Sequence, residues 1–172
     1  MNDLDYLKIC YNEALKAKAK DEVPVGCVIV KDGVIIAKTH NLRETKKSVL
    51  AHAEVLAIKK ACQKTKTKFL DGSTIYITLE PCLMCLGAII QARISRIVYS
   101  ADEPKFGCIN SVAHIIDDYK FNTKITYEKG LMKEEVSSLM KDFFQKKRTK
   151  KCVNIFQKKR TKKCWFYNKN RL

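Results

Sequence analysis

The sequence predicts one α/β domain, in which helices cover both faces of a five-stranded mixed sheet. Two observations support this fold class. Short apolar runs bounded by turn residues alternate along the chain with segments in which apolar residues recur every three or four positions. The length of 172 residues and the 46% hydrophobic composition suit a single domain with a sizeable core, and they exclude a wholly disordered chain.

The first part of the chain predicts a helix, a hairpin and a second helix. Apolar spacing predicts an amphipathic helix over residues 4–19, with Asp3 as its N-terminal cap. Two β-rich runs then flank an Asp-Gly pair at residues 32–33, which is typical of an antiparallel hairpin. The polar residues 41–50 indicate a loop, and residues 52–62 return to helical spacing.

The second part predicts strands that alternate with helices, which implies parallel pairing. Residues 73–79 form a β-rich run, and a helix is expected from Pro81 to about Arg93, because proline is favoured at the first helical position. The remaining expected elements are a strand at 96–99, a loop at 101–112, a weak strand at 124–127 and a helix at 131–147.

The net charge of +16 is concentrated at the C-terminus. Residues 1–140 hold 21 Lys and Arg against 17 Asp and Glu, whereas residues 141–172 hold 13 against one. The nine residues 144–152 recur unchanged at 156–164. We therefore divide the chain into a domain at 1–148 and a basic extension at 149–172. The extension interleaves cations with aromatic residues, which suits RNA contact, but it is equally compatible with a solvated, non-specific tail.

Targeting signals and cysteine usage indicate a cytoplasmic protein. The acidic N-terminus lacks the features of a signal peptide, and no run approaches the roughly 18–20 apolar residues of a membrane span. In a cytoplasmic chain of this size, the eight cysteines indicate thiols or metal ligands and not a disulfide framework.

Two short segments carry the chemistry. His52-Ala53-Glu54 opens one expected helix, and Pro81-Cys82-Leu-Met-Cys85 opens another. One imidazole and two thiolates give three zinc ligands, which is typical of catalytic zinc because a fourth position stays open for water. His-x-Glu with Pro-Cys-x-x-Cys is the signature of zinc deaminases that act on nucleobases, in which the glutamate moves protons. The alternatives are buried free cysteines or a zinc ribbon, but a ribbon needs a fourth ligand, and these residues lack the spacing: Cys27, Cys62, Cys108 and His114.

These segments belong to a longer stretch that resembles the bacterial tRNA-specific adenosine deaminases, members of the cytidine deaminase-like superfamily. The resemblance covers residues 4–148. It rests on the segments 23–26, 40–41, 51–54, 78–88, 92–98, 104–107 and 142–144. The two zinc segments are shared across the superfamily, whereas the stretch from 78 to 107 and the Asp-Phe-Phe run at 142–144 favour the tRNA branch.

The resemblance implies a three-layer α/β/α fold and a homodimer. It implies hydrolytic deamination of the wobble adenosine in a tRNA anticodon stem-loop, with arginine tRNA as the expected substrate and one Zn²⁺ per subunit. By position, the zinc ligands would be His52, Cys82 and Cys85, and Glu54 would shuttle protons. Asn41 would contact the flipped-out base, and the path of the anticodon would be lined by Val25, Gly26, Glu103, Lys105 and Phe106.

Two loop residues depart from a simple family match. Glu103 stands where this branch usually has aspartate, and the bulky Phe106 would either stack on an unpaired base or cover a dimer contact. Two other functions remain open: a deaminase of a free base or nucleoside such as guanine, cytosine or cytidine, and a zinc-stabilised RNA-binding protein without turnover. The loop at 102–107 and the basic C-terminus favour a polymer substrate, and Glu54 disfavours a purely structural zinc site.

Overall fold

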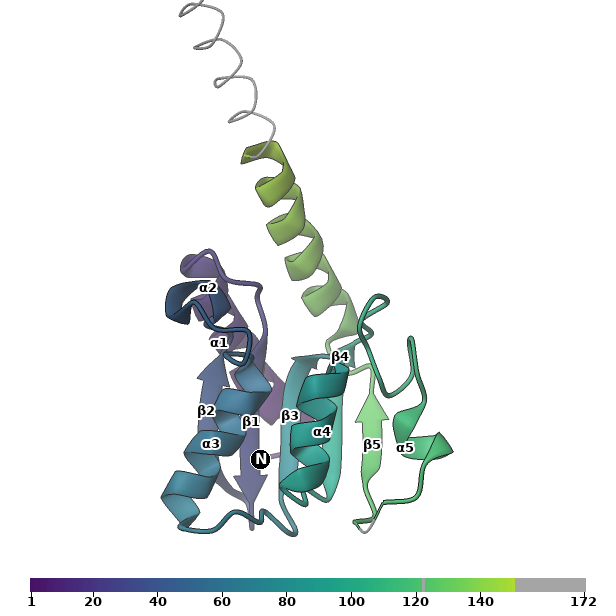
Figure 1. The fold of residues 1–172 in the computed structure, drawn as a ribbon. Helices are drawn as coiled ribbons and strands as arrows, with labels where there is room; N and C mark the ends of the chain where they lie inside the picture. Colours follow the sequence, from purple (N-terminus) through teal and green to yellow (C-terminus); the bar gives the residue numbers. More distant parts are fainter. Residues whose placement is uncertain (122, 151–172) are drawn as a thin grey trace, which may run out of the picture.

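A five-stranded sheet in the order β2-β1-β3-β4-β5 forms the centre of the protein (Figure 1). The structure is a computed structural model, and it describes residues 1–121 and 123–150. The strand β1 pairs antiparallel with β2 and β3, whereas β4 pairs parallel with β3 and β5. The predicted mixed sheet is confirmed, with strands at Gly26–Lys31 (β1), Val34–His40 (β2), Thr74–Leu79 (β3), Arg96–Ala101 (β4) and Thr126–Lys129 (β5).

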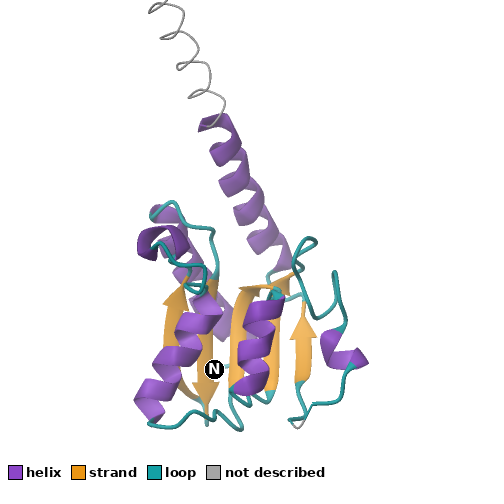
Figure 2. Cartoon of the chain, viewed as in Figure 1, coloured by secondary structure: helices purple, strands orange, loops and turns teal. Residues whose placement is uncertain are grey.

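Helices cover both faces of this sheet, which gives the predicted three layers (Figure 2). The helices α3 (Ala53–Thr65) and α4 (Leu83–Gln91) lie side by side on one face, and α1 (Asp3–Ala19) covers the other. A helix over residues 133–150 contacts α1 through an ion pair of Lys18 with Asp142, and it contacts the segment after α1 through an ion pair of Lys147 with Asp21. In the part of the chain that the structure describes, no helix combines the length and the hydropathy that crossing a bilayer requires.

The side chains of β1 point alternately to the two faces of the sheet, and both faces are covered by helices, which explains why its run of apolar residues is unbroken. Cys27 and Ile29 belong to the core cluster beneath α3 and α4, whereas Val28 and Val30 belong to the cluster beneath α1. Successive side chains of a strand point to opposite faces, so a strand that is buried on both faces needs apolar residues at every position.

The cap of α1 differs from the sequence prediction. Asn2, and not Asp3, is the N-cap: its side chain accepts a hydrogen bond from the Asp5 amide at 3.0 Å, and Asp5 accepts one from the Asn2 amide at 3.0 Å. The carboxylate of Asp3 is engaged elsewhere, because it accepts two hydrogen bonds from Arg96 and one from the hydroxyl of Tyr76. The prediction for Asp3 was therefore wrong because of a partner 93 residues away.

Other elements also differ from prediction, and β5 covers residues 126–129 where the sequence predicted a strand at 124–127. The helix α4 begins at Leu83 with Cys82 as its N-cap, so Pro81 precedes the helix. Two short helices, α2 (Arg43–Lys46) and α5 (Ile115–Asp118), lie in stretches without a predicted helix. The last helix continues through residue 150, beyond the expected end at 147. The boundary at 148/149 stays a prediction, and the second copy of the repeat lies outside the described residues.

Candidate active site

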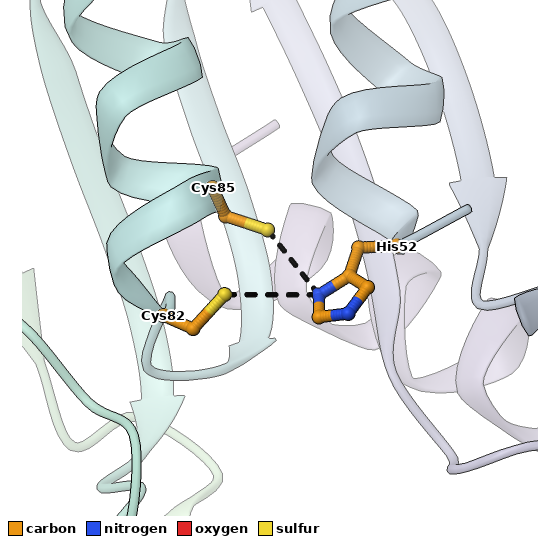
Figure 3. A group of neighbouring side chains, drawn as sticks. All are labelled: His52, Cys82 and Cys85. Atoms are coloured by element: carbon orange, nitrogen blue, oxygen red, sulfur yellow. Dashed lines mark hydrogen bonds between the residues drawn. The ribbon is translucent and has the colours of Figure 1, made fainter. Parts of the chain in front are cut away.

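Two helix N-termini bring the predicted zinc ligands together. His52 is the N-cap of α3 and Cys82 is the N-cap of α4, while Cys85 lies one turn into α4. Figure 3 shows both sulfur atoms pointing toward the imidazole ring from the neighbouring helix. Because the N-terminus of a helix carries a partial positive charge, this position favours thiolates over thiols.

The distances between these side chains fit a tetrahedral zinc ion. Nδ1 of His52 lies 3.4 Å from Sγ of Cys85 and 3.8 Å from Sγ of Cys82, and the three possible ligand atoms lie within 4.8 Å of one another. Tetrahedral bonds of typical Zn–N and Zn–S length would separate nitrogen from sulfur by about 3.6 Å. Among residues 1–121 and 123–150, no other group of three or more His, Cys, Asp or Glu side chains converges in this way. These side chains would supply three ligands to a zinc ion.

The two thiols differ strongly in acidity. The hydrogen bond with Cys85 lowers the pKa of Cys82 to about 4, and the same contact raises the pKa of Cys85 above its usual value. The hydrogen bond with Cys82 also raises the pKa of His52. A divalent cation binds only the deprotonated forms of these ligands, so metal binding at this site would release protons.

Glu54 lies in the first turn of α3, two residues after His52, and its side chain is buried. Burial is the main cause that raises the pKa of this carboxyl above its usual value. A raised pKa makes a carboxyl group a better proton acceptor than an exposed carboxylate. Its position and acidity suit the proton transfer expected from the sequence.

The segment of the predicted residue Asn41 is hydrogen-bonded to the segment that carries His52. The amide of Leu42, the neighbour of Asn41, donates to the carbonyl of Ala51, directly before His52, at 3.0 Å. The backbone amide of Asn41 donates to the carbonyl of Val25 at 3.0 Å. Asn41 also lines a cleft of about 220 Å³ between α2 and the last helix, together with Val23, Arg43, Phe143, Phe144 and Lys147.

Gly26 has a structural reason to be glycine. A Cβ atom at this position would lie 1.9 Å from the backbone oxygen of Cys10 in α1. The absence of a side chain therefore allows β1 and α1 to approach closely. No contact in the structure tests the predicted place of Gly26 on the anticodon path.

The predicted loop residues lie on the other side of the triad. Gly107 forms a β-bridge with Cys82, and the Cys108 amide donates to the carbonyl of Pro81 at 3.1 Å. This loop carries Glu103, Lys105 and Phe106, and 67% of Phe106 is exposed. The structure thus places both predicted sets of substrate contacts next to segments that supply zinc ligands.

One residue of the site has no role in the sequence analysis. Glu80 is buried, with 2% of its surface exposed, and its carboxylate accepts hydrogen bonds from the loop that carries Lys105. The signal in the sequence is a carboxylate at the end of an apolar strand, immediately before the Pro-Cys pair. The donors lie 23 to 31 residues further along the chain, so local spacing does not reveal them.

Zinc-dependent deaminases of nucleobases use three zinc ligands of these types and a glutamate that moves protons. The triad and the buried Glu54 of α3 match that arrangement, so the fold and the site define a protein of this class. A family model described as MafB19-like deaminase matches residues 1–148. The tRNA-specific adenosine deaminase of Bacillus subtilis is 42% identical over 146 residues, which cover 85% of this chain and 91% of that protein. The corresponding protein of Aquifex aeolicus is 46% identical over 143 residues, which cover 83% and 94%.

A solved structure from a study of A-to-I editing by tRNA:A34 deaminases at the wobble position of transfer RNA has a similar fold. Its TM-score is 0.75 at 36% identity, and the match covers 78% of this chain and 98% of that one. The chain belongs to the family of tRNA-specific adenosine deaminases. Deaminases of this fold use zinc, and the His-Cys-Cys donor set fits that ion.

Proposed function

We propose that this protein deaminates adenosine to inosine at the wobble position of a tRNA anticodon, with arginine tRNA as substrate. The observation that carries the proposal is the convergence of His52, Cys82 and Cys85 beside the buried Glu54, in a chain of this family. Relatives with 42% and 46% identity are named tRNA-specific adenosine deaminases, which supports adenosine in tRNA over other substrates.

The four site residues have distinct roles in this proposal. His52, Cys82 and Cys85 would hold zinc, which when bound would lower the pKa of a water to about 7 and so supply a nucleophile at neutral pH. Glu54 takes a proton from the attacking water and delivers it to the adenine ring nitrogen as the new C6–O bond forms. Glu54 then carries the second proton to the exocyclic amine, the C6–N bond breaks, and ammonia leaves. Adenosine and water thus yield inosine and ammonia.

The target base must leave its stack before it reaches Glu54, and anticodon loops offer unpaired bases. We assign the contacts to the base to Asn41, whose neighbour Leu42 is hydrogen-bonded to Ala51, the residue before His52. The nucleotides around it would run along the surfaces next to the zinc segments, over Val25, Gly26, Glu103, Lys105 and Phe106. The exposure of Phe106 suits stacking on a base, which is tolerant of sequence because every base has a π-face.

We also propose that two copies of the chain associate. Exposed apolar side chains lie close in sequence to the zinc segments and to the loop beside them: Val49, Leu50, Leu83 and Val112. Exposed apolar side chains are typical of interfaces, and a second copy would cover them. Replacing Leu83 by aspartate should convert a dimer in solution into a monomer, as measured by light scattering. A wild-type protein that is monomeric at every concentration tested would refute this assembly.

We place the enzyme in the cytoplasm.

The test uses an arginine tRNA transcript with an ACG anticodon, read out for inosine by sequencing. Free adenosine, cytidine and guanine are incubated in parallel, and Glu54→Gln serves as the matched control. We expect inosine at the wobble position with the wild-type protein only, while the variant keeps its zinc. Turnover of a free base or nucleoside, without turnover of tRNA, would assign the alternative deaminase activity. RNA binding without turnover of any substrate would indicate a zinc-stabilised binding protein.

A further inference from the structure

The buried carboxylate of Glu80 is the centre of a hydrogen-bond network that the proposed chemistry does not use. Its Oε1 atom accepts from the amides of Ile109 at 3.0 Å, Asn110 at 2.7 Å and Ser111 at 3.1 Å. Its Oε2 atom accepts from the amide of Glu103 at 3.0 Å and from the hydroxyl of Ser111. One side chain at the end of β3 therefore holds both ends of the loop that runs from residue 103 to residue 111.

This network fits a carboxylate better than any neutral side chain. Three successive amides that converge on one oxygen form a concave anion-binding arrangement of the backbone. Without an acceptor there, these inward-facing amides would lack partners, and burying an unpaired amide is unfavourable. The conformation of the loop thus depends on Glu80, because both oxygen atoms must accept and neither position tolerates a donor.

Gly107 provides a second, independent observation. A Cβ atom at Gly107 would lie 2.3 Å from Oε2 of Glu80 and 2.6 Å from the carbonyl oxygen of Glu103. The loop wraps around the carboxylate so closely that only glycine fits. Gly107 also forms the β-bridge to Cys82, so the same wrapping fixes the loop against the segment with the first zinc cysteine.

Between the two anchored ends, the loop presents the exposed side chains of Lys105 and Phe106. These are a cation and an aromatic ring, which are the two side-chain types that hold single-stranded RNA. A flexible loop would lose entropy on binding RNA, whereas a loop that is already held in place would not.

We propose that Glu80 is a positioning residue, whose carboxylate holds the 103–111 loop so that Lys105 and Phe106 are presented to RNA next to the zinc triad. The RNA part of this proposal rests on the proposed function. The part that concerns the loop depends only on the hydrogen bonds around Glu80, and it can be measured without a substrate.

The first test measures the loop itself in the full chain. Trypsin can cleave after Lys105, and mass spectrometry identifies the fragment that ends there. In Glu80→Gln, the amide nitrogen of the new side chain faces a backbone donor in either orientation, so we expect cleavage at Lys105 to become at least about tenfold faster. Zinc content should stay at the wild-type level. Wild-type cleavage kinetics in Glu80→Gln would overturn the proposal.

The matched control is Asp3→Asn, which alters another hydrogen-bonded carboxylate at a distance from the loop. Asp3 accepts from Arg96 and Tyr76. This variant should lose global stability but keep Lys105 protected. Equal acceleration in both variants would mean that cleavage follows global unfolding, and it would overturn the local role of Glu80.

If Glu80→Gln does not fold, Ser111→Ala tests the same network, because it removes one donor and should accelerate cleavage at Lys105 more mildly.

The second test measures the consequence for RNA. With an anticodon stem-loop as substrate, Glu80→Gln should raise KM by about tenfold and change kcat by less than about threefold, because the loop positions RNA and does not take part in proton transfer. Faster cleavage with an unchanged KM would overturn the positioning role. Failure of the wild-type protein to deaminate RNA would refute the proposed function instead, and the cleavage kinetics would still decide whether Glu80 holds the loop.

Discussion

Replacing Gly26 by alanine tests how closely α1 lies against the sheet. Gly26 is the first residue of β1, and an added Cβ would lie 1.9 Å from the backbone oxygen of Cys10 and 2.8 Å from the backbone nitrogen of Ala14. Both atoms belong to the backbone of α1, so no side-chain rotation relieves the overlap. Either the helix or the strand must move by more than an ångström.

The expected cost follows from what such a movement disturbs. Overpacking usually costs about 1–3 kcal/mol when side chains can adjust, and we expect the upper end, about 3 kcal/mol, because only the backbone can adjust here. Movement of α1 would also disturb the contacts of its fully buried residues, which are Leu7, Cys10, Ala14 and Ala17. In a domain of this size each kcal/mol lowers Tm by about 2–4 °C, which gives a decrease of about 6–12 °C.

The assay is urea unfolding followed by circular dichroism, with Gly87→Ala as the matched control. Gly87 lies within α4, and a Cβ atom there would meet nothing within 4 Å. The same chemical change should therefore stabilise α4 by about 0.5–1 kcal/mol, because alanine is the better helix former. A Gly26→Ala protein that matches the wild type in its free energy of unfolding would refute the close contact between α1 and β1.

Three further outcomes are expected. Cys82→Ala should lose zinc, as measured by elemental analysis, whereas Cys108→Ala, which removes a thiol outside the triad, should keep it; full zinc occupancy in Cys82→Ala would disprove the ligand set. The hydrogen bond with Arg96 lowers the pKa of Asp3, so this contact stabilises the fold above the unfolded-state pKa of about 4 and is lost as the pH falls below it. The destabilisation of Asp3→Asn in urea, about 1–3 kcal/mol at pH 7, should therefore shrink toward pH 2, and an equal value at both pH values would contradict this coupling. Deletion of residues 149–172 should weaken tRNA binding and flatten its dependence on salt, because the segment is rich in Lys and Arg, while zinc content stays intact; an unchanged salt slope would indicate a passive extension.

Periodicity and turn chemistry predicted the strands of this fold because both signals are local. The alternating faces of β1 and the Asp-Gly turn before β2 depend on neighbours in the sequence. The cap of α1 is also local, a capping box between Asn2 and Asp5, and the prediction chose the neighbouring Asp3, whose carboxylate is engaged by Arg96 from β4. The short helix α2 was missed because its first amides donate to the buried carboxylate of Glu22, about twenty residues away.

In the candidate site, too, local motifs predicted some residues, whereas the roles of others depend on distant segments. The residues of the triad were predictable because each lies at or near the start of a helix within a short motif, and the structure brings them together. The role of Glu80 and the cleft that joins Asn41 to Phe143 depend on segments far apart in the sequence. Spacing along the chain identifies groups that share one turn, whereas groups that meet across a sheet edge depend on the strand order.

His52 and Cys82 lie at the N-termini of α3 and α4 with side chains that are available to bind a metal. Both residues are N-caps, yet neither side chain makes the capping hydrogen bond that serine or asparagine would make there. Such a cap typically stabilises a helix by about 1 kcal/mol, so two helices forgo it at the same place. Their side chains are thereby free to bind an ion, and the amides at the helix starts keep their positive potential for the thiolates. The core beneath α3 and α4 holds these helices in place through buried apolar residues such as Ala57, Ala61 and Ile89. The same elements can therefore present the ligands before a metal binds, which distinguishes this site from one that folds only around its zinc.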